Sequence, residues 1–305
     1  MTGRVSGASR KVPGVKANEC FAGARRTMRQ MISIPRIAGI ALLLPLAAGG
    51  TGAASRAVSP VPLRRVQLAP DLYLRQIGDG AYVITHVFPW PANSLLVEMA
   101  DGTLVLAGTP YTPAATQTVL AWAAGQFGAR RMVAINTGYH VDNLGGNQAL
   151  RAAGIAVYGS DLTVRLLQER GERSRRLTLQ AIGDAGSPAY QAHASLKFEA
   201  PDHVFPLTEG LELIFGGDRV RAFFPGPSQA PDKVVVYFAA RRLLFGSCMI
   251  LAADRPGNTA DADLQRWPEA IRKLAQFPVD VVVPGHGDRL DPGLIQHTLE
   301  VLGAR

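Results

Sequence analysis

The sequence predicts an α/β fold in which two mixed β-sheets pack face to face, with helices on the outside of both sheets. Short apolar or alternating runs, which are typical of strands, occur in two groups along the chain. Each group is accompanied by segments whose apolar residues recur at helical spacing. Because a sheet that is covered by helices on one face buries its other face against another layer, the two groups are expected to form two packed sheets.

The first group is predicted to be an antiparallel meander that leads into a helix and a further strand. Asp101 and Gly102 form a hairpin turn within the meander. Thr112 and Pro113 start the helix, because Thr is a preferred N-cap residue and Pro is favoured at the first helical position. The apolar face of this helix consists of Val119, Leu120, Trp122 and Phe127. The expected strands cover residues 72–77, 82–87, 94–99, 103–106 and 131–136.

The second group follows a weakly patterned, charged segment over residues 169–201, which we interpret as a connection. A helix is predicted to begin near residues 259–261, and a closing helix at Leu294. The buried stripe of the first of these helices is expected to consist of Leu264, Trp267, Ile271 and Leu274. The expected strands cover residues 203–207, 211–215, 220–224, 233–238, 243–246 and 279–283.

The positive charge of the chain is confined to its N-terminal leader. The formal net charge is +8 at pH 7. Residues 1–57 hold nine Arg and Lys residues against the single acidic Glu19, so the rest of the chain is neutral. A neutral domain lacks the excess of basic residues that is typical of nucleic-acid-binding proteins. We therefore predict that residues 58–305, whose length allows one large domain or two small ones, do not bind nucleic acid.

The leader has the layout of an export signal. A basic stretch that ends at Arg36 precedes an apolar run over residues 37–48, and small residues suitable for cleavage follow at 53–55. The apolar run is shorter than the roughly 20 residues that a membrane-spanning helix needs, so we expect no stable membrane anchor. The mature protein is predicted to be periplasmic or secreted. A later start at Met28 or Met31 remains open.

Three predicted strands each lead to a side chain that can bind a metal ion. These side chains are Asp142, Cys248 and His286. Oxygen, sulfur and nitrogen donors together are a mixture that zinc accepts in a tetrahedral shell, with one position left for water. Cys248 is the only cysteine after the leader, which excludes an internal disulfide in the mature protein. Metal binding explains why a single thiol persists in an oxidising compartment.

Each of these residues also has an alternative interpretation. Asp142 and His140 precede a helix and are possible helix caps. Cys248 is either a small buried hydrophobic residue or a nucleophile with a histidine as its base. The Gly145-Gly146 pair indicates tight backbone packing rather than phosphate binding, because no P-loop lysine follows it.

Six motifs follow one another in a fixed order between residues 136 and 287. They are Asn136-Thr137-Gly138-Tyr139-His140-Val141-Asp142, Gly145-Gly146-Asn147, Phe224-Pro225-Gly226-Pro227, residues 243–250, Gly257-Asn258-Thr259-Ala260-Asp261-Ala262-Asp263 and Pro284-Gly285-His286-Gly287. In these motifs the chain from about Leu72 to its end resembles the metallo-β-lactamases, and most closely the subclasses that bind zinc through cysteine. The resemblance implies a single domain over residues 58–305 with a four-layer αβ/βα sandwich, and a zinc-dependent hydrolase that opens the β-lactam ring of antibiotics.

Several positions depart from the pattern of this family. The first His of its His-x-His-x-Asp motif is Gly138 here, and Gln229 stands where the third ligand of the three-His zinc site belongs. Only His140 of that site remains, so we expect the site to be empty and one zinc ion to bind to the Asp-Cys-His set, as in the mono-zinc subclass. Leu251 replaces a Lys that pairs with the substrate carboxylate in family members. The loss of such a contact costs about 1.5–3 kcal/mol.

The resemblance also implies roles for the side chains around the ion. His140, with Asp142 as the alternative, is expected to take a proton from the attacking water. Asn258 is expected to donate a hydrogen bond to the carbonyl oxygen as negative charge develops there. Gln229 and Asn143 are expected to line the empty site and to hold the water.

Two other functions remain open, namely hydrolysis of a lactone or thioester, and zinc binding by a catalytically weak relative. In each case we expect a monomer that acts on or binds a small molecule. His86 and Trp90 lie where the family has a mobile hairpin over the active site, and they are candidates for substrate contact. The remaining histidines match no motif and are interpreted as surface or connection residues; they are His193, His203 and His297.

Overall fold

The computed structural model describes residues 64–303 of the 305-residue chain. The predicted leader, its cleavage site and the predicted domain boundary at residue 58 lie outside the described residues. Among the helices that are described, none is both long enough and apolar enough to span a membrane.

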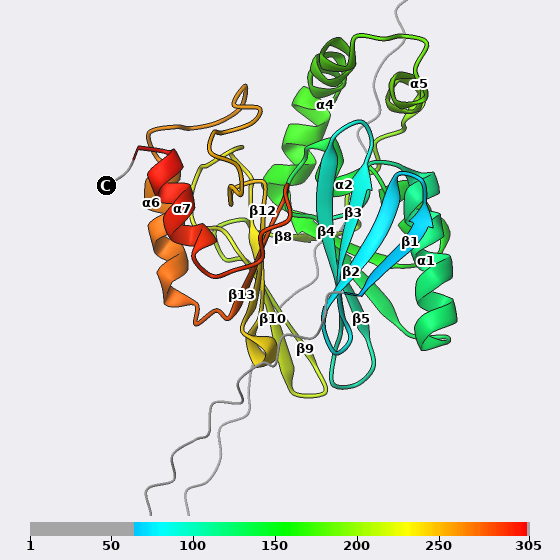
Figure 1. Cartoon of the computed structure of the whole chain (residues 1–305), viewed down its shortest axis with the longest axis vertical. Helices are drawn as coiled ribbons and strands as arrows, with labels where there is room; N and C mark the ends of the chain where they lie inside the picture. Colours follow the sequence, from blue (N-terminus) through cyan, green and yellow to red (C-terminus); the bar gives the residue numbers. More distant parts are fainter. Residues whose placement is uncertain (1–63, 304–305) are drawn as a thin grey trace, which may run out of the picture. The chain divides into compact units, whose positions relative to one another are not determined.

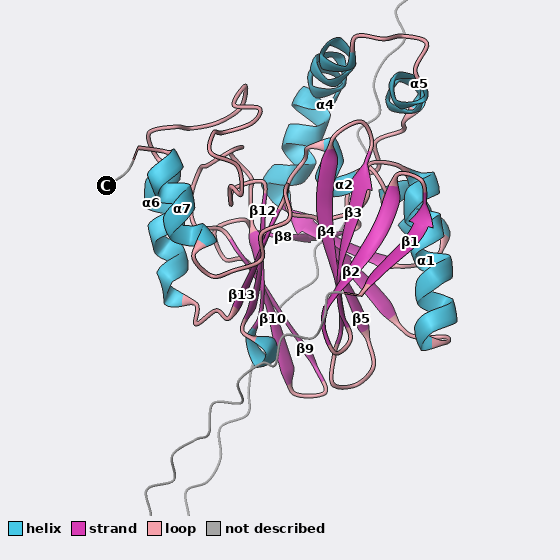
Figure 2. Cartoon of the chain, in the orientation of Figure 1, coloured by secondary structure: helices cyan, strands magenta, loops and turns pink. Residues whose placement is uncertain are grey.

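Two mixed β-sheets with helices on their outer faces form the fold, as predicted (Figures 1 and 2). The eight-stranded sheet runs in the order β1 (Arg65–Ala69), β2 (Leu72–Gly78), β3 (Ala81–Val87), β4 (Pro91–Glu98), β5 (Leu104–Ala107), β6 (Met132–Ile135), β7 (Ala156–Ser160) and β8 (His203–Phe205). The five-stranded sheet runs in the order β13 (Val281–Pro284), β12 (Leu243–Ser247), β11 (Val235–Phe238), β10 (Asp218–Phe223) and β9 (Leu211–Phe215).

Helix α1 (Pro113–Phe127) lies on the outer side of the eight-stranded sheet, and α6 (Trp267–Arg272) and α7 (Leu294–Val301) lie on the outer side of the five-stranded sheet (Figure 2). Helices α4 (Asp161–Ile182) and α5 (Pro188–Ser195), which connect β7 to β8, lie at one end of the sheets. The shorter helices are α2 (Val141–Leu144), α3 (Asn147–Ala152), η1 (Ala239–Arg241) and η2 (Lys273–Gln276).

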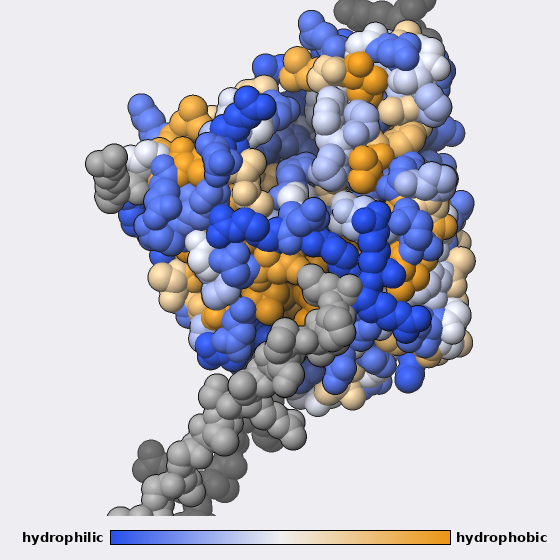
Figure 3. Space-filling model, in the orientation of Figure 1, coloured by the Kyte–Doolittle hydropathy of each residue, from blue (hydrophilic) through white to orange (hydrophobic). Residues whose placement is uncertain are grey.

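The side chains along a strand point alternately to the two faces of its sheet, which explains how the sheets pack against each other and against the helices. In β4, Leu95 points into the core between the sheets, where it joins Phe245 of β12, and the next residue, Leu96, packs toward α1. In β12, Leu244 points the other way and packs with Trp267 of α6. Because successive side chains of a strand face opposite sides, both faces of the central strands β4 and β12 are apolar and both are covered. On the face shown in Figure 3, hydrophilic residues predominate and apolar residues form smaller groups.

The predicted start of α1 is confirmed, whereas the connection predicted over residues 169–201 is wrong. Thr112 Oγ1 accepts a hydrogen bond from Ala115 N at 3.2 Å, as an N-cap residue does. Most of the supposed connection is helical and belongs to α4 and α5. Helix α4 is rich in Arg and Glu, and the buried apolar residues of its own sequence are few, namely Leu166 and Leu167. Its apolar stripe is too narrow to show as a clear helical pattern.

Three further predictions need correction. The helix expected near residues 259–261 begins at Trp267, and Leu264 is 54% exposed instead of belonging to the buried stripe. The strand predicted over residues 203–207 pairs with β7 in the eight-stranded sheet, so it belongs to the first group of strands. Strands β1 and β7 are present although the sequence did not indicate them.

Candidate metal centre

The centre lies at the carboxyl ends of three strands from both sheets. The loop after β6 carries His140 and leads into the short helix α2 with Asp142; β12 leads directly to Cys248, and β13 leads to His286. The sheets are joined beside the centre, because Val234 N donates a hydrogen bond to the carbonyl of Thr137 at 3.1 Å. The predicted ligands thus come from elements that the fold itself holds together.

Asp142, Cys248 and His286 offer ligand atoms that all lie within 4.8 Å of one another. Asp142 Oδ2 lies 2.9 Å from Cys248 Sγ and 3.3 Å from His286 Nε2. Zinc bonds of about 2.0–2.3 Å in a tetrahedral shell place the ligand atoms roughly 3.3–3.8 Å apart. The three donors therefore fit a single zinc ion with small adjustments, and the half-exposed His286 side chain leaves the centre open to solvent.

The orientation of His286 is fixed by the β3–β4 hairpin. Its Nδ1–H donates to the carbonyl of Pro91 at 2.7 Å, which leaves Nε2 to face Asp142. Asn93 Nδ2 donates to the carbonyls of Pro284 and Gly287 on either side of His286, at 3.0 and 2.8 Å. A hydrogen bond at one imidazole nitrogen sets the tautomer that a metal ion needs at the other.

The loops that carry Cys248 and His286 approach each other very closely. Gly285 N donates to the carbonyl of Ser247 at 2.7 Å. A Cβ at residue 285 would lie only 2.6 Å from the backbone of Ser247 and from Cys248 N, so only glycine fits there. Ser247 itself has a φ of 49°, which is uncommon for a residue other than glycine and turns the chain sharply after β12. This turn directs Cys248 toward Asp142.

Asn143 lies beneath the predicted ligands and not in the position that the sequence suggested. Its Oδ1 accepts hydrogen bonds from Thr137 Oγ1 and Ser247 Oγ at 2.5 and 2.7 Å. Its Nδ2 donates to Asp142 Oδ1 at 2.6 Å and contacts Cys248 Sγ at 3.8 Å. All its polar atoms are used within the protein. Asn143 therefore positions two proposed ligands, Asp142 and Cys248, from below, and it has no polar group left to hold a water molecule.

His140 is paired with a carboxylate that the sequence analysis did not single out. Its Nε2–H donates to Asp261 Oδ2 at 3.1 Å, and the hydroxyl of Tyr139 donates to the same oxygen at 2.5 Å. Arg170 of α4 lies 3.7 Å from the other oxygen of Asp261. His140 occupies the N-cap position of α2 but makes no capping hydrogen bond, so the alternative of a helix cap is wrong. Within the described residues its Nδ1 has no hydrogen-bond partner.

Gln229 and Asn258 lie next to each other, as their proposed roles require. Gln229 Nε2 donates to the backbone carbonyl of Asn258 at 3.1 Å, and Gln229 Oε1 is buried without a hydrogen-bond partner among the described residues. Asn258 is exposed, and its Oδ1 accepts a hydrogen bond from Ala260 N at 3.0 Å. The side-chain amide of Asn258 is thus free to meet a ligand.

A buried cation also faces the centre. Lys233, just before β11, is 0% exposed. Burial disfavours its charged form, but the negative charges of Cys248, Asp142 and Asp232 together raise the pKa of Lys233. Sequence reasoning missed Lys233 because lysines are rarely buried, and nothing in the local pattern sets this one apart.

The charges around Asp142 keep it ionised. Burial alone would raise the pKa of Asp142, but the hydrogen bond from His286 and the charge of Lys233 hold it well below its usual range. In the same way, loss of water around the ring nitrogen that faces Asp142 opposes protonation of His286, although the rest of the side chain is half-exposed. Its contacts with Asp142 and Cys248 nevertheless raise the pKa of His286 well above 6.5. Protons and a metal ion therefore compete for this set, and metal binding releases protons.

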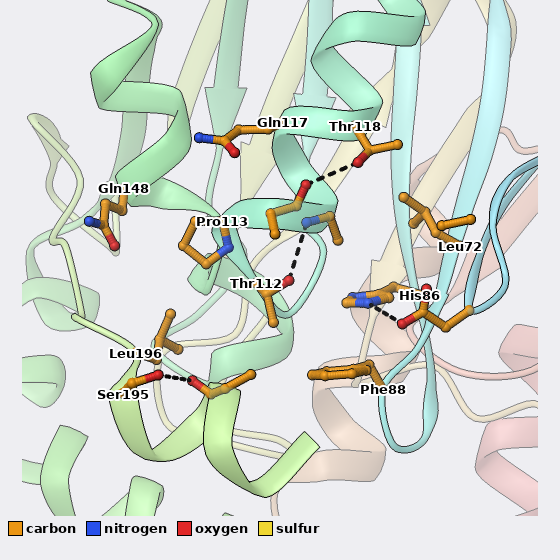
Figure 4. Close-up of a pocket in the computed structure, with 15 residues that line it drawn as sticks. Leu72, His86, Phe88, Thr112, Pro113, Gln117, Thr118, Gln148, Ser195 and Leu196 are labelled. Atoms are coloured by element: carbon orange, nitrogen blue, oxygen red, sulfur yellow. Dashed lines mark hydrogen bonds and ion pairs between the residues drawn. The ribbon is translucent and has the colours of Figure 1, made fainter. Parts of the chain in front are cut away.

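A cavity of about 570 Å³ lies beside the N-terminal turn of α1 and does not include the three predicted ligands (Figure 4). His86 and Phe88 form part of its wall. His86 is buried, with Tyr111 N donating to its Nδ1 at 3.2 Å, whereas Trp90 is 43% exposed. Of the histidines interpreted as surface residues, His193 is in fact buried at 3% exposure.

Comparison with known proteins agrees with this geometry. The family model described as the metallo-beta-lactamase superfamily matches residues 87–286. The chain belongs to the metallo-β-lactamase superfamily. Its class is therefore that of the metallo-hydrolases, and the fold predicted from the motifs is confirmed.

Relatives of this superfamily member are similar over most of its length. A metallo-beta-lactamase type 2 from Bacteroides fragilis is 27% identical over 255 residues, which cover 80% of this chain and 91% of that protein. The corresponding protein from Bacillus cereus is 28% identical over 216 residues, covering 70% and 73%. A solved metallo-beta-lactamase from Pontibacter korlensis superposes with a TM-score of 0.59 at 29% identity, covering 80% of this chain and 100% of that one.

Proposed function

We propose that this protein is a zinc-dependent hydrolase that opens a β-lactam ring with one zinc ion, held by Asp142, Cys248 and His286. The observation that carries the proposal is the mutual approach of these three ligand atoms within 4.8 Å. The donor types support zinc, and the superfamily relatives at 27–28% identity are named metallo-beta-lactamases.

Zinc bound to these residues supplies a Lewis acid that polarises water or the departing ring nitrogen. His140 takes the proton from the attacking water through its Nδ1. Asp261 accepts the Nε2–H of His140 and so holds the tautomer in which Nδ1 is free. Asp142 is the weaker candidate for the base, because Oδ1 accepts from Asn143 and Oδ2 faces Cys248 and His286.

Two side chains complete the proposed reaction. Asn258 donates its amide to the carbonyl oxygen as negative charge builds up there, which its exposed position allows. Gln229 presents its unpartnered Oε1 beside Asn258 and holds the water. Asn143 is no longer assigned to the water, since its amide is fully engaged beneath the ligands.

A second candidate is hydrolysis of a lactone or a thioester. It is favoured by Leu251, which is 9% exposed and packs in the apolar cluster with Trp267 and Leu294 of the outer helices. Residue 251 therefore brings no cation to the centre. The absence of a cation at residue 251 does not weaken the binding of a substrate without a carboxylate. A β-lactam antibiotic, in contrast, lacks one ionic contact at this position.

Hydrolysis assays on one zinc-loaded preparation separate these functions. We expect nitrocefin and a carbapenem to be hydrolysed, and a chelator to abolish the reaction. Turnover restricted to a γ-lactone or a thioester would establish the second candidate. A preparation that contains zinc but hydrolyses none of the four substrates would mean a catalytically weak zinc-binding relative.

We further propose that the protein is an exported monomer, periplasmic or secreted. The basic and apolar leader supports this proposal. N-terminal sequencing of the mature protein from cell fractions, together with its mass by light scattering, tests the cleavage site and the oligomeric state.

A further inference from the structure

Lys233 is a buried charge without a hydrogen bond. Its side chain is 0% exposed, and its Nζ has no hydrogen-bond partner among the described residues. A buried ammonium that is not hydrogen-bonded is costly and must be offset by negative charge. Lysine is among the residues least often found fully buried. A burial of this kind therefore calls for a specific reason.

The negative charge that offsets Lys233 comes mainly from the metal centre. Cys248, Asp142 and Asp232 are the groups whose charges favour its ammonium. Asp232 is also fully buried; its Oδ2 accepts a hydrogen bond from Thr163 Oγ1 at 2.8 Å, and its Oδ1 has no hydrogen-bond partner within residues 64–303. Two of the three groups whose charges favour the ammonium are thus proposed metal ligands.

Gly138 shows what space the ammonium occupies. A Cβ built on Gly138 would lie 3.0 Å from Lys233 Cδ, 3.1 Å from Lys233 Nζ and 3.3 Å from Asp232 Oδ1. The φ of Gly138 is not in the left-handed region, so glycine is not needed there for backbone reasons. Glycine at this position instead leaves room for the end of the lysine. The space toward which a side chain at 138 would extend is taken by a cation.

We propose that the Lys233 ammonium is a built-in second cation of the centre, which neutralises its anionic groups and limits it to one metal ion. This inference rests on the proposed zinc site. A divalent ion next to the ammonium would meet strong repulsion at short range, in a buried place where water screens little. Lys233 is thus a positioning residue: it touches no substrate, and it acts through the ligands that it faces and the ion that it keeps out.

Metal analysis tests this proposal without an activity assay. Wild-type protein is dialysed against excess zinc and its metal content is measured; we expect about one ion per chain. The variant G138H/Q229H adds two imidazoles and keeps Lys233, and we expect it to stay near one ion. The variant G138H/Q229H/K233A removes the ammonium as well, and we expect its content to rise to about two. The exposed Lys197, changed to Ala in the G138H/Q229H background, is the matched control and is expected to stay near one.

Each result has a defined meaning. Two ions in the wild type or in G138H/Q229H, or a single ion in the variant that also lacks Lys233, would overturn the proposal. If the added imidazoles prevent folding, the wild-type measurement can still overturn the proposal, because a second ion at zinc excess contradicts exclusion by Lys233. No zinc at all in the wild type would instead refute the Asp142, Cys248 and His286 site, so the two failures are distinguishable.

Discussion

The two sides of the centre contrast sharply. On one side, Asp142, Cys248 and His286 converge, and each is held by backbone and side-chain contacts. On the other side, His140 is bound to Asp261, and Lys233 fills the space in front of Gly138. Positive charge on this second side is thus supplied by the chain itself. The difference supports our proposal that Lys233 neutralises on this side the negative charge that a metal ion would neutralise on the other.

The largest effect is expected from a substitution among the three proposed ligands, and it should appear in zinc affinity. Cys248→Ser replaces a thiolate by a hydroxyl that stays protonated at neutral pH, so zinc affinity should fall by at least about a hundredfold. Equilibrium zinc titration and β-lactam hydrolysis measure the loss. Retention of full zinc content and full hydrolysis by this variant would refute the proposed site.

A smaller effect, on kcat, is expected from a substitution on the side of His140 and Asp261. Asp261→Asn removes the carboxylate that orients His140, so kcat should fall about ten- to a hundredfold while zinc content stays unchanged. The exposed Asp254, changed to Asn, serves as the control. Loss of zinc in Asp261→Asn would show that His140 and Asp261 belong to the ligand side instead.

The third prediction concerns a histidine outside both sides and affects stability, not zinc binding or catalysis. Burial lowers the pKa of His86 to about 4, and the nearby carboxylate of Asp71 offsets this only in part. The unfolded chain binds a proton at His86 near pH 6.5 and the folded protein only near pH 4, so stability is lost as pH falls through this window.

Denaturant titrations of His86→Gln and wild type, both zinc-loaded, measure this contribution. Going from pH 7 to pH 4, the wild type should lose roughly 2–4 kcal/mol more than the variant. His203→Gln, at an exposed histidine that also lies beside a carboxylate, should show no comparable difference. Parallel pH curves for wild type and His86→Gln would mean that His86 is not kept neutral by burial.

Sequence reasoning predicted the fold, and it also predicted three residues that the structure brings together, because both are indicated by local patterns. The strands that carry Cys248 and His286 are short apolar runs that end at the functional residue, so their topology alone brings the ends together. The sequence did not predict helix α4, because this helix is stabilised by a few buried contacts and its N-cap and has no broad apolar face. The sequence did not single out Lys233 and Asp261 as site residues, because their roles depend on side chains that are distant in the sequence and close in the fold.

The β3–β4 hairpin connects an exposed aromatic side chain to one of the proposed metal ligands. The carbonyl of Pro91 accepts the Nδ1–H of His286, Asn93 donates to the backbone carbonyls on either side of it, and Trp90 is exposed at the tip of the same hairpin. A displacement of the hairpin would therefore move the imidazole, because the residues that hold it directly follow Trp90 in the chain.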